Sequence, residues 1–157
     1  IDSAPNAGYP TSIAIGSDGL PIVAYGREVG AGKWVILVSR CTAPACDSGA
    51  STSVLDPGPN VGAYARLAIG GDGLPVIAFQ VFNPVAPFVS LDVARCLDAG
   101  CSAIAPPTTI ESGGTGAAGT GPAGRAIAVA SDGLPIISYV DESGRLRVAK
   151  CGTLGCR

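Results

Sequence analysis

Six cysteines are the residues whose types and spacing most directly suggest chemistry in this chain. They form three Cys-x₄-Cys pairs that recur every 55 residues: Cys41/Cys46, Cys96/Cys101 and Cys151/Cys156. Zinc sites usually combine two nearby pairs, often with histidine, and a catalytic dithiol usually occurs once, as Cys-x-x-Cys. The chain has no histidine, and its pairs lie far apart. We therefore predict three local disulfides formed in an oxidising compartment, with no metal and no cofactor.

An aspartate followed by glycine also recurs in every repeat. Calcium loops need several alternating oxygen ligands, and the Asp-box of sialidase blades continues to a tryptophan that is absent here. We interpret these aspartates as turn residues whose carboxylates accept hydrogen bonds from their own backbone. Asp-Gly further predicts a two-residue type I′ hairpin turn, in which both residues have positive φ. The pairs are Asp18-Gly19, Asp72-Gly73 and Asp132-Gly133.

Adjacent carboxylates occur at Asp141 and Glu142, in a short segment that we expect to be a plain hairpin loop. The first repeat has Arg27-Glu28 at the equivalent place, and the second repeat is uncharged there. Without histidine, a Ser-His-Asp triad is excluded. We therefore predict no catalytic residue and no enzymatic activity, and a hydrolase is only the third hypothesis.

One loop is unusually apolar and has no counterpart in the other repeats. Its side chains either pack against a neighbouring repeat or contact another subunit or a ligand. The residues concerned are Phe82, Pro84, Pro87 and Phe88.

The composition restricts the partners. Hydrophobic residues make up 47% of the 157 positions and charged residues only 14%, well below the usual quarter. The net charge of −2 gives no reason to expect nucleic acid. No apolar stretch approaches the roughly 18 residues of a membrane span. The 23 glycines and 13 prolines, among many Ile, Val and Leu, favour short strands joined by tight turns.

These residues lie in three tandem repeats, which we bound at 1–46, 47–101 and 102–157. Each repeat contains four short strand patterns, the first with both faces apolar, as at 12–15, 66–69 and 126–129. Strands that are apolar on both faces are covered on both sides. The predicted fold is all-β, with three four-stranded antiparallel propeller-type blades in one continuous domain.

The repeats resemble tandem repeats of secreted bacterial proteins. The resemblance rests on Thr11-Ser-Ile-Ala-Ile15, on the Asp-x-x-Pro turn that follows, and on Leu146-Arg-Val-Ala-Lys-Cys151 through Cys156. It covers nearly the whole chain. It implies a propeller-like fold and a secreted, extracellular or cell-surface location, and it implies no reaction.

Three blades are fewer than the four to eight that close a propeller, so we expect two open, apolar end faces. We place Ile13/Ile15 with Ile36/Val38 on one, and Ile127/Val129 with Leu146/Val148 on the other. Ile1 is in phase with Leu55 and Ile110, as in a piece of a longer array or a head-to-tail junction. The expected partners are copies of the chain or further blades.

The leading hypothesis for function is a non-enzymatic, extracellular structural or adhesive repeat protein that assembles into a closed propeller or a fibre. The alternative is a lectin-like propeller that binds glycans between blades, through Tyr25, Phe79 or Tyr139.

The cysteine spacing gives a direct prediction. Peptide mapping without reduction should find each cysteine bonded to the other member of its pair, because one hairpin end brings both together. Removing one pair should lower the free energy of unfolding by about 2 kcal/mol, the chain-entropy effect of a short closed loop. Free thiols, or bonds between repeats, would contradict the prediction.

Overall fold

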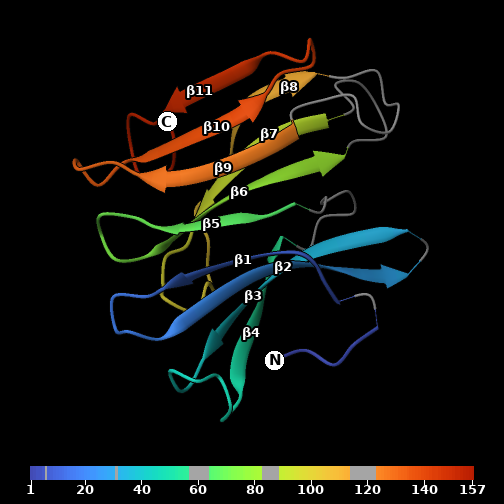
Figure 1. Cartoon of the computed structure of the whole chain (residues 1–157), viewed down its shortest axis with the longest axis vertical. Helices are drawn as coiled ribbons and strands as arrows, with labels where there is room; N and C mark the ends of the chain where they lie inside the picture. The colour runs from blue at the N-terminus through green and yellow to red at the C-terminus, as the bar shows by residue number, and fades with distance from the viewer. Residues whose placement is uncertain (6, 31, 57–63, 83–88, 114–122) are drawn as a thin grey trace.

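The computed structural model describes residues 1–5, 7–30, 32–56, 64–82, 89–113 and 123–157 (Figure 1). Within these ranges the chain is all-β, with three antiparallel sheets and no helix. The sheets follow one another along the chain and stack, with their first strands side by side. No helix of the length and hydrophobicity needed to cross a bilayer occurs in the described part of the chain.

Each sheet is a meander of consecutive strands. The first sheet consists of β1 (Ala7–Ile15), β2 (Pro21–Gly30), β3 (Lys33–Cys41) and β4 (Ala50–Asp56). The second consists of β5 (Arg66–Ile69), β6 (Pro75–Phe82), β7 (Val89–Arg95) and β8 (Thr108–Gly113). The third consists of β9 (Ala123–Val129), β10 (Pro135–Val140) and β11 (Leu146–Lys150).

The predicted all-β class is confirmed, and the prediction of four strands in every blade is wrong for the third sheet. That sheet has three strands among the described residues, and the three sheets do not close into a ring. The fourth strands, β4 and β8, pair with β3 and β7 of their own sheets. The repeat boundaries drawn after residues 46 and 101 therefore fall between the third and fourth strands of a sheet.

Alternation along the strands gives each sheet two apolar faces. We call one the front face, which carries Ile13, Ile15, Val23 and Tyr25 in the first sheet, and the other the back face. The back face of the first sheet carries Ile22, Ala24, Ile36 and Val38. All four of these back-face side chains are fully buried against the second sheet.

The same front-on-back packing joins the second sheet to its two neighbours. Its front face, with Leu67, Ile77 and Phe79, covers the back face of the first sheet. Its own back face, with Val93, packs against Tyr139 of the third sheet. Burying a side chain such as Phe79 contributes about 2–3 kcal/mol. These two apolar layers hold the sheets together.

The expected composition of the end faces was wrong. Because Val23 and Ala24 are successive residues, their cross-strand neighbours Ile13 and Val38 lie on opposite sides of the first sheet. By the same alternation, Ile127 and Val148 lie on opposite sides of the third sheet. Each end of the stack therefore exposes one side of a sheet, and the first strand of the first sheet is covered on one side only.

The Asp-Gly turns have a different geometry from the predicted type I′. In the first sheet, Gly19 donates a backbone hydrogen bond to Gly16, and Gly16 donates one to Leu20. Only the glycine of the pair has positive φ, 80° at Gly19. The Asp18 carboxylate accepts a 3.0 Å hydrogen bond from the Leu20 amide, which stabilises the wider loop.

Every turn aspartate also binds the basic residue at or next to the end of the third strand of its sheet. Asp18 pairs with Arg40, Asp72 with Arg95 and Asp132 with Lys150. These partners, together with the backbone amides, lower the pKa of the aspartates. The contact explains why each repeat carries a basic residue directly before its first cysteine.

Two of these turns meet at the junction of the second and third sheets. The Gly71 amide donates a 2.9 Å hydrogen bond to the Gly133 carbonyl. A Cβ at Gly71 would lie only 2.6 Å from the Gly133 Cα. The other two repeats have Ser17 and Ser131 at this position. Only glycine allows this close backbone approach.

Gly71→Ala should therefore destabilise the protein by about 1–3 kcal/mol, because the methyl group forces two backbone segments apart. Gly155→Ala is the matched control, since a Cβ there meets no atom within 4 Å and its φ is ordinary. Urea unfolding of both variants measures the difference. Equal stability of the two variants would show that the turns do not pack in this way.

Candidate functional site

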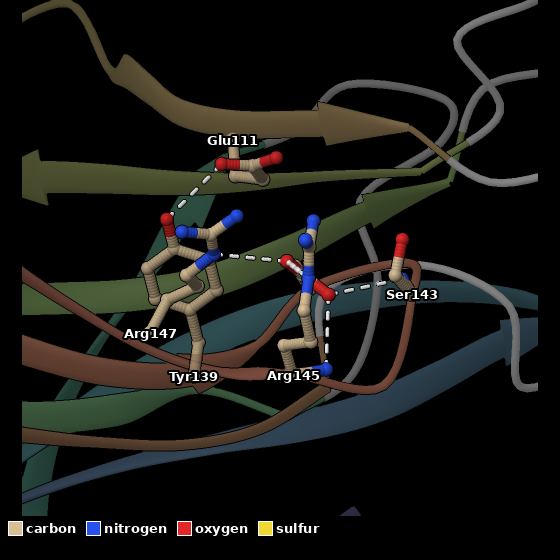
Figure 2. Close-up of polar contacts among 6 residues, drawn as sticks. Glu111, Tyr139, Ser143, Arg145 and Arg147 are labelled. Atoms are coloured by element: carbon tan, nitrogen blue, oxygen red, sulfur yellow. Dashed lines mark hydrogen bonds and ion pairs between the residues drawn. The ribbon is translucent and has the colours of Figure 1, made fainter.

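A cluster of charged and aromatic side chains lies where the third sheet meets the outer strand of the second (Figure 2). We call it the polar cluster, and it consists of Glu111, Tyr139, Asp141, Arg145 and Arg147. Glu111 lies on β8, Tyr139 on β10 and Arg147 on β11. Asp141 and Arg145 belong to the β10–β11 hairpin turn, closed by the Asp141 amide on the Arg145 carbonyl.

Asp141 is the centre of the polar cluster. Its carboxylate accepts hydrogen bonds from the backbone amides of Ser143 and Arg145, both at 3.0 Å. It also accepts from Nε of Arg145 at 3.0 Å and from Nε of Arg147 at 2.9 Å. The side chain is only 4% exposed.

These contacts fix the charge of the group. The Arg145 backbone amide, followed by the two guanidinium groups, lowers the pKa of Asp141 from 3.8 to about 2. The same contact raises the pKa of Arg147. Asp141 is therefore a permanent anion that orients two arginines and has no proton to give near neutral pH.

Tyr139 and Glu111 connect the two sheets. The Tyr139 hydroxyl donates a 3.0 Å hydrogen bond to the Glu111 carboxylate. Burial, with the hydrogen bond and charge of Glu111, raises the pKa of Tyr139. The hydroxyl therefore stays protonated, and it holds Glu111 in one position above the third sheet.

The first sheet carries a related arrangement on its front face. The Tyr25 hydroxyl donates a 2.9 Å hydrogen bond to Asp2, and Arg27 lies 3.3 Å from the same carboxylate oxygen. The Ala4 amide lowers the pKa of Asp2, with help from Tyr25 and Arg27, and burial raises the pKa of Tyr25. A small cavity of about 150 Å³ lies beside Asp2 and Tyr25, and Thr11 and Val23 also line it.

The exposed groups of the polar cluster could bind a polyhydroxylated ligand. The side chains of Arg145 and Arg147 are at least half exposed and offer N–H donors. Glu111 offers acceptor oxygens, and Glu142 lies against Gly113 on the same side. Neighbouring donors and acceptors of this kind suit the hydroxyl groups of a sugar, which both donate and accept hydrogen bonds. Within the described ranges, no group of three or more acidic or cysteine side chains is placed to hold a metal ion.

The six cysteines are not part of the polar cluster. Cys41 bonds to Cys46, Cys96 to Cys101 and Cys151 to Cys156, in tight turns after β3, β7 and β11. In each pair the second cysteine has positive φ, and its amide closes a turn onto the residue three positions earlier. Five of the six cysteines lie in the buried core, so the disulfides support the sheet ends.

The other predicted sites lie elsewhere. The three Asp-Gly turns follow the first strand of each sheet, as described above. Of the apolar loop, Phe82 ends β6 and is partly exposed. Pro84, Pro87 and Phe88 lie outside the described residues.

Sequence reasoning treated Asp141 as a plain loop residue and missed the polar cluster. Arg145 and Arg147 are two positions apart, so in an extended segment their side chains lie on the same face and can reach one carboxylate. This spacing after the acidic residues of the hairpin was the available sequence signal. The contribution of Glu111 could not be read in this way, because it lies on β8 of the second sheet, far from the hairpin in the sequence.

Among the solved structures that a search found to be similar to this chain are the following three. An endo-arabinase from Bacteroides thetaiotaomicron VPI-5482 matches with a TM-score of 0.56 at 15% identity, over 91% of this chain and 55% of its own. A thermostable family-43 glycoside hydrolase gives 0.53 at 13% identity, over 94% and 54%. An endo-1,4-β-xylanase from the same Bacteroides gives 0.46 at 15%, over 93% and 59%. No protein-family model and no curated protein matches the sequence.

The chain thus has a propeller-like fold found in glycoside hydrolases, and it spans about half the length of those structures. This finding contradicts the expectation of a non-enzymatic structural or adhesive protein, because the proteins that share the fold are enzymes. The expectation rested on the missing histidine, on Asp141 and Glu142 interpreted as a plain hairpin loop, and on a resemblance that implies no reaction. None of these excludes an activity that uses carboxyl groups, because function depends on the site that a fold carries.

The low pKa of Asp141 predicts a specific pH dependence of stability. A carboxyl group whose pKa is lower in the folded than in the unfolded protein stabilises the fold. This contribution is fully present above the pKa of the unfolded state, near 3.8, and is lost as the pH falls through the folded-state pKa of about 2. Asp141→Asn should therefore be less stable than the wild type at about pH 6, and the difference should shrink towards pH 2. Urea unfolding across this range measures it. A difference that does not change with pH would contradict the assignment.

Proposed function

We propose that this chain is part of a secreted propeller that hydrolyses polysaccharides, and that its polar cluster contacts the sugar chain. The observation that carries the proposal is the polar cluster itself, where two oriented arginines, a tyrosine and a glutamate meet on a fold shared with an endo-arabinase and a family-43 glycoside hydrolase. Arabinan and xylan are the substrates to test first.

The environments of the carboxyl groups suggest different roles for them. Glycoside hydrolysis commonly uses one carboxyl group that donates a proton and one that stays ionised. Asp141, with a pKa of about 2, cannot donate a proton near neutral pH. In this proposal Asp141 is a positioning residue that holds Arg145 and Arg147 towards the sugar.

Glu111 and Glu142 are the carboxyl groups of this region that we assign to substrate contact. One carboxylate oxygen of Glu111 accepts the hydrogen bond from the Tyr139 hydroxyl, and in this proposal the other carboxylate oxygen contacts the ligand. Glu142 is exposed and follows Asp141 directly in the hairpin turn. Both face the border between the second and third sheets.

A secreted location supports the same function. Three disulfides in a small all-β chain are consistent with an oxidising, extracellular setting. Polysaccharides too large to enter a cell have to be degraded there.

The test is the release of reducing sugar from arabinan and xylan by the purified chain. Glu111→Gln and Glu142→Gln should each lower kcat/KM by about 10- to 100-fold, because each removes a charged hydrogen-bonding contact with the substrate. Glu28→Gln is the matched control for Glu142→Gln, since Glu28 occupies the place of Glu142 in the first repeat and should leave kcat/KM unchanged.

Two results would overturn this proposal. In one, neither polysaccharide is cleaved, and in the other, Glu111→Gln and Glu142→Gln both cleave at the wild-type rate. Retained binding to immobilised arabinan or xylan, without cleavage, would leave the lectin-like alternative in its place.

A further inference from the structure

Two apolar sheet faces are uncovered at the ends of the stack. On the front face of the first sheet, Ile13 is 64% exposed and Ile15 is 57% exposed. On the back face of the third sheet, Leu146 is 73% exposed and Val148 is 66% exposed. Exposed large apolar side chains in adjacent positions mark an interaction surface.

The equivalent positions inside the stack are buried or partly buried. Leu67 occupies the place of Ile13 in the second sheet and is 6% exposed. Ile69, in the place of Ile15, is partly buried. Leu91 and Val93 occupy the places of Leu146 and Val148, and both are fully buried. The same side-chain sets are therefore packed wherever a neighbouring sheet is present.

The two internal junctions use one rule. The back face of each sheet covers the front face of the next sheet. Both junctions between the described sheets therefore join a back face to a front face. The uncovered back face of the third sheet and the uncovered front face of the first sheet form the pair of faces that this rule brings together.

We propose that the front face of the first sheet binds the back face of the third sheet of a second copy of this chain. The contact is heterologous, so each copy offers one face and accepts the other. Ile13 and Ile15 of one copy then pack against Leu146 and Val148 of its neighbour. The proposal does not depend on any enzymatic activity.

The position of Asp2 supports this arrangement and sets its register. Asp2 binds Tyr25 as Glu111 binds Tyr139 across the junction of the second and third sheets. Glu111 is paired with Leu91, and Asp56 is paired with Ile36, the equivalent residue of the first sheet. In the third sheet the equivalent residue is Leu146. The first copy therefore places its Asp2 beside Leu146 of the second copy, along the outer edge of that copy's β11.

Light scattering coupled to size exclusion tests the contact on the intact chain over a range of concentrations. The wild type should give a mass of at least twice 15.4 kDa. Ile13→Glu and Val148→Glu should each give 15.4 kDa, because each places an unpaired charge in the apolar contact, where burying it is unfavourable. Leu97→Glu is the matched control at a half-exposed apolar residue in the turn after β7, and it should assemble like the wild type. Circular dichroism checks that all variants fold.

A mixture of the two face variants distinguishes this contact from a symmetric one. Ile13→Glu keeps an intact back face and Val148→Glu keeps an intact front face, so together they should form a dimer of one each and nothing larger. A wild type that stays at 15.4 kDa, a face variant that still assembles alone, or a mixture that stays monomeric would each overturn the proposal.

Discussion

The packing of one sheet's back face on the next sheet's front face is the constraint on which the rest of this structure depends. Ile22, Ile36 and Val38 of the first sheet lose all contact with water only because Leu67 and Phe79 lie opposite them. A single four-stranded meander with two apolar faces has no core of its own. The sheets therefore stabilise one another, and charged residues are left to the edges and turns. This accounts for a chain in which only 14% of the residues are charged.

The polar contacts mostly complete the ends of these sheets. The turn aspartates bind the basic residue at the end of the third strand, and the disulfides close the turn that follows. The polar cluster differs, because Glu111 reaches it from the neighbouring sheet. There, charged groups from two sheets meet with exposed donors and acceptors. That difference is the reason for placing a ligand at the polar cluster and a scaffold role at the turns.

Much of the fold could be predicted from the residues alone. The 55-residue spacing, the Asp-Gly turns and the alternating third strands gave the all-β class and the position of nearly every strand. Two details failed, one because of a hydrogen bond within the turn and one because of strand pairing. The type I′ turn was wrong because the Asp18 carboxylate binds Leu20 and widens the loop. The end faces were wrong because the side on which Val38 lies follows from its pairing with Ala24.

Local chemistry thus determined which segments of this protein become strands and turns, since turn preference, alternation and cysteine spacing act between residues close in sequence. Contacts between sheets were decided only by the tertiary structure. Gly71 replaces the serine of the other repeats because its backbone touches Gly133, 62 positions further along the chain. Glu111 accepts the hydrogen bond of the Tyr139 hydroxyl because β8 of the second sheet lies against the third sheet. Such contacts require the stacked sheets, and no pattern of neighbouring residues encodes them.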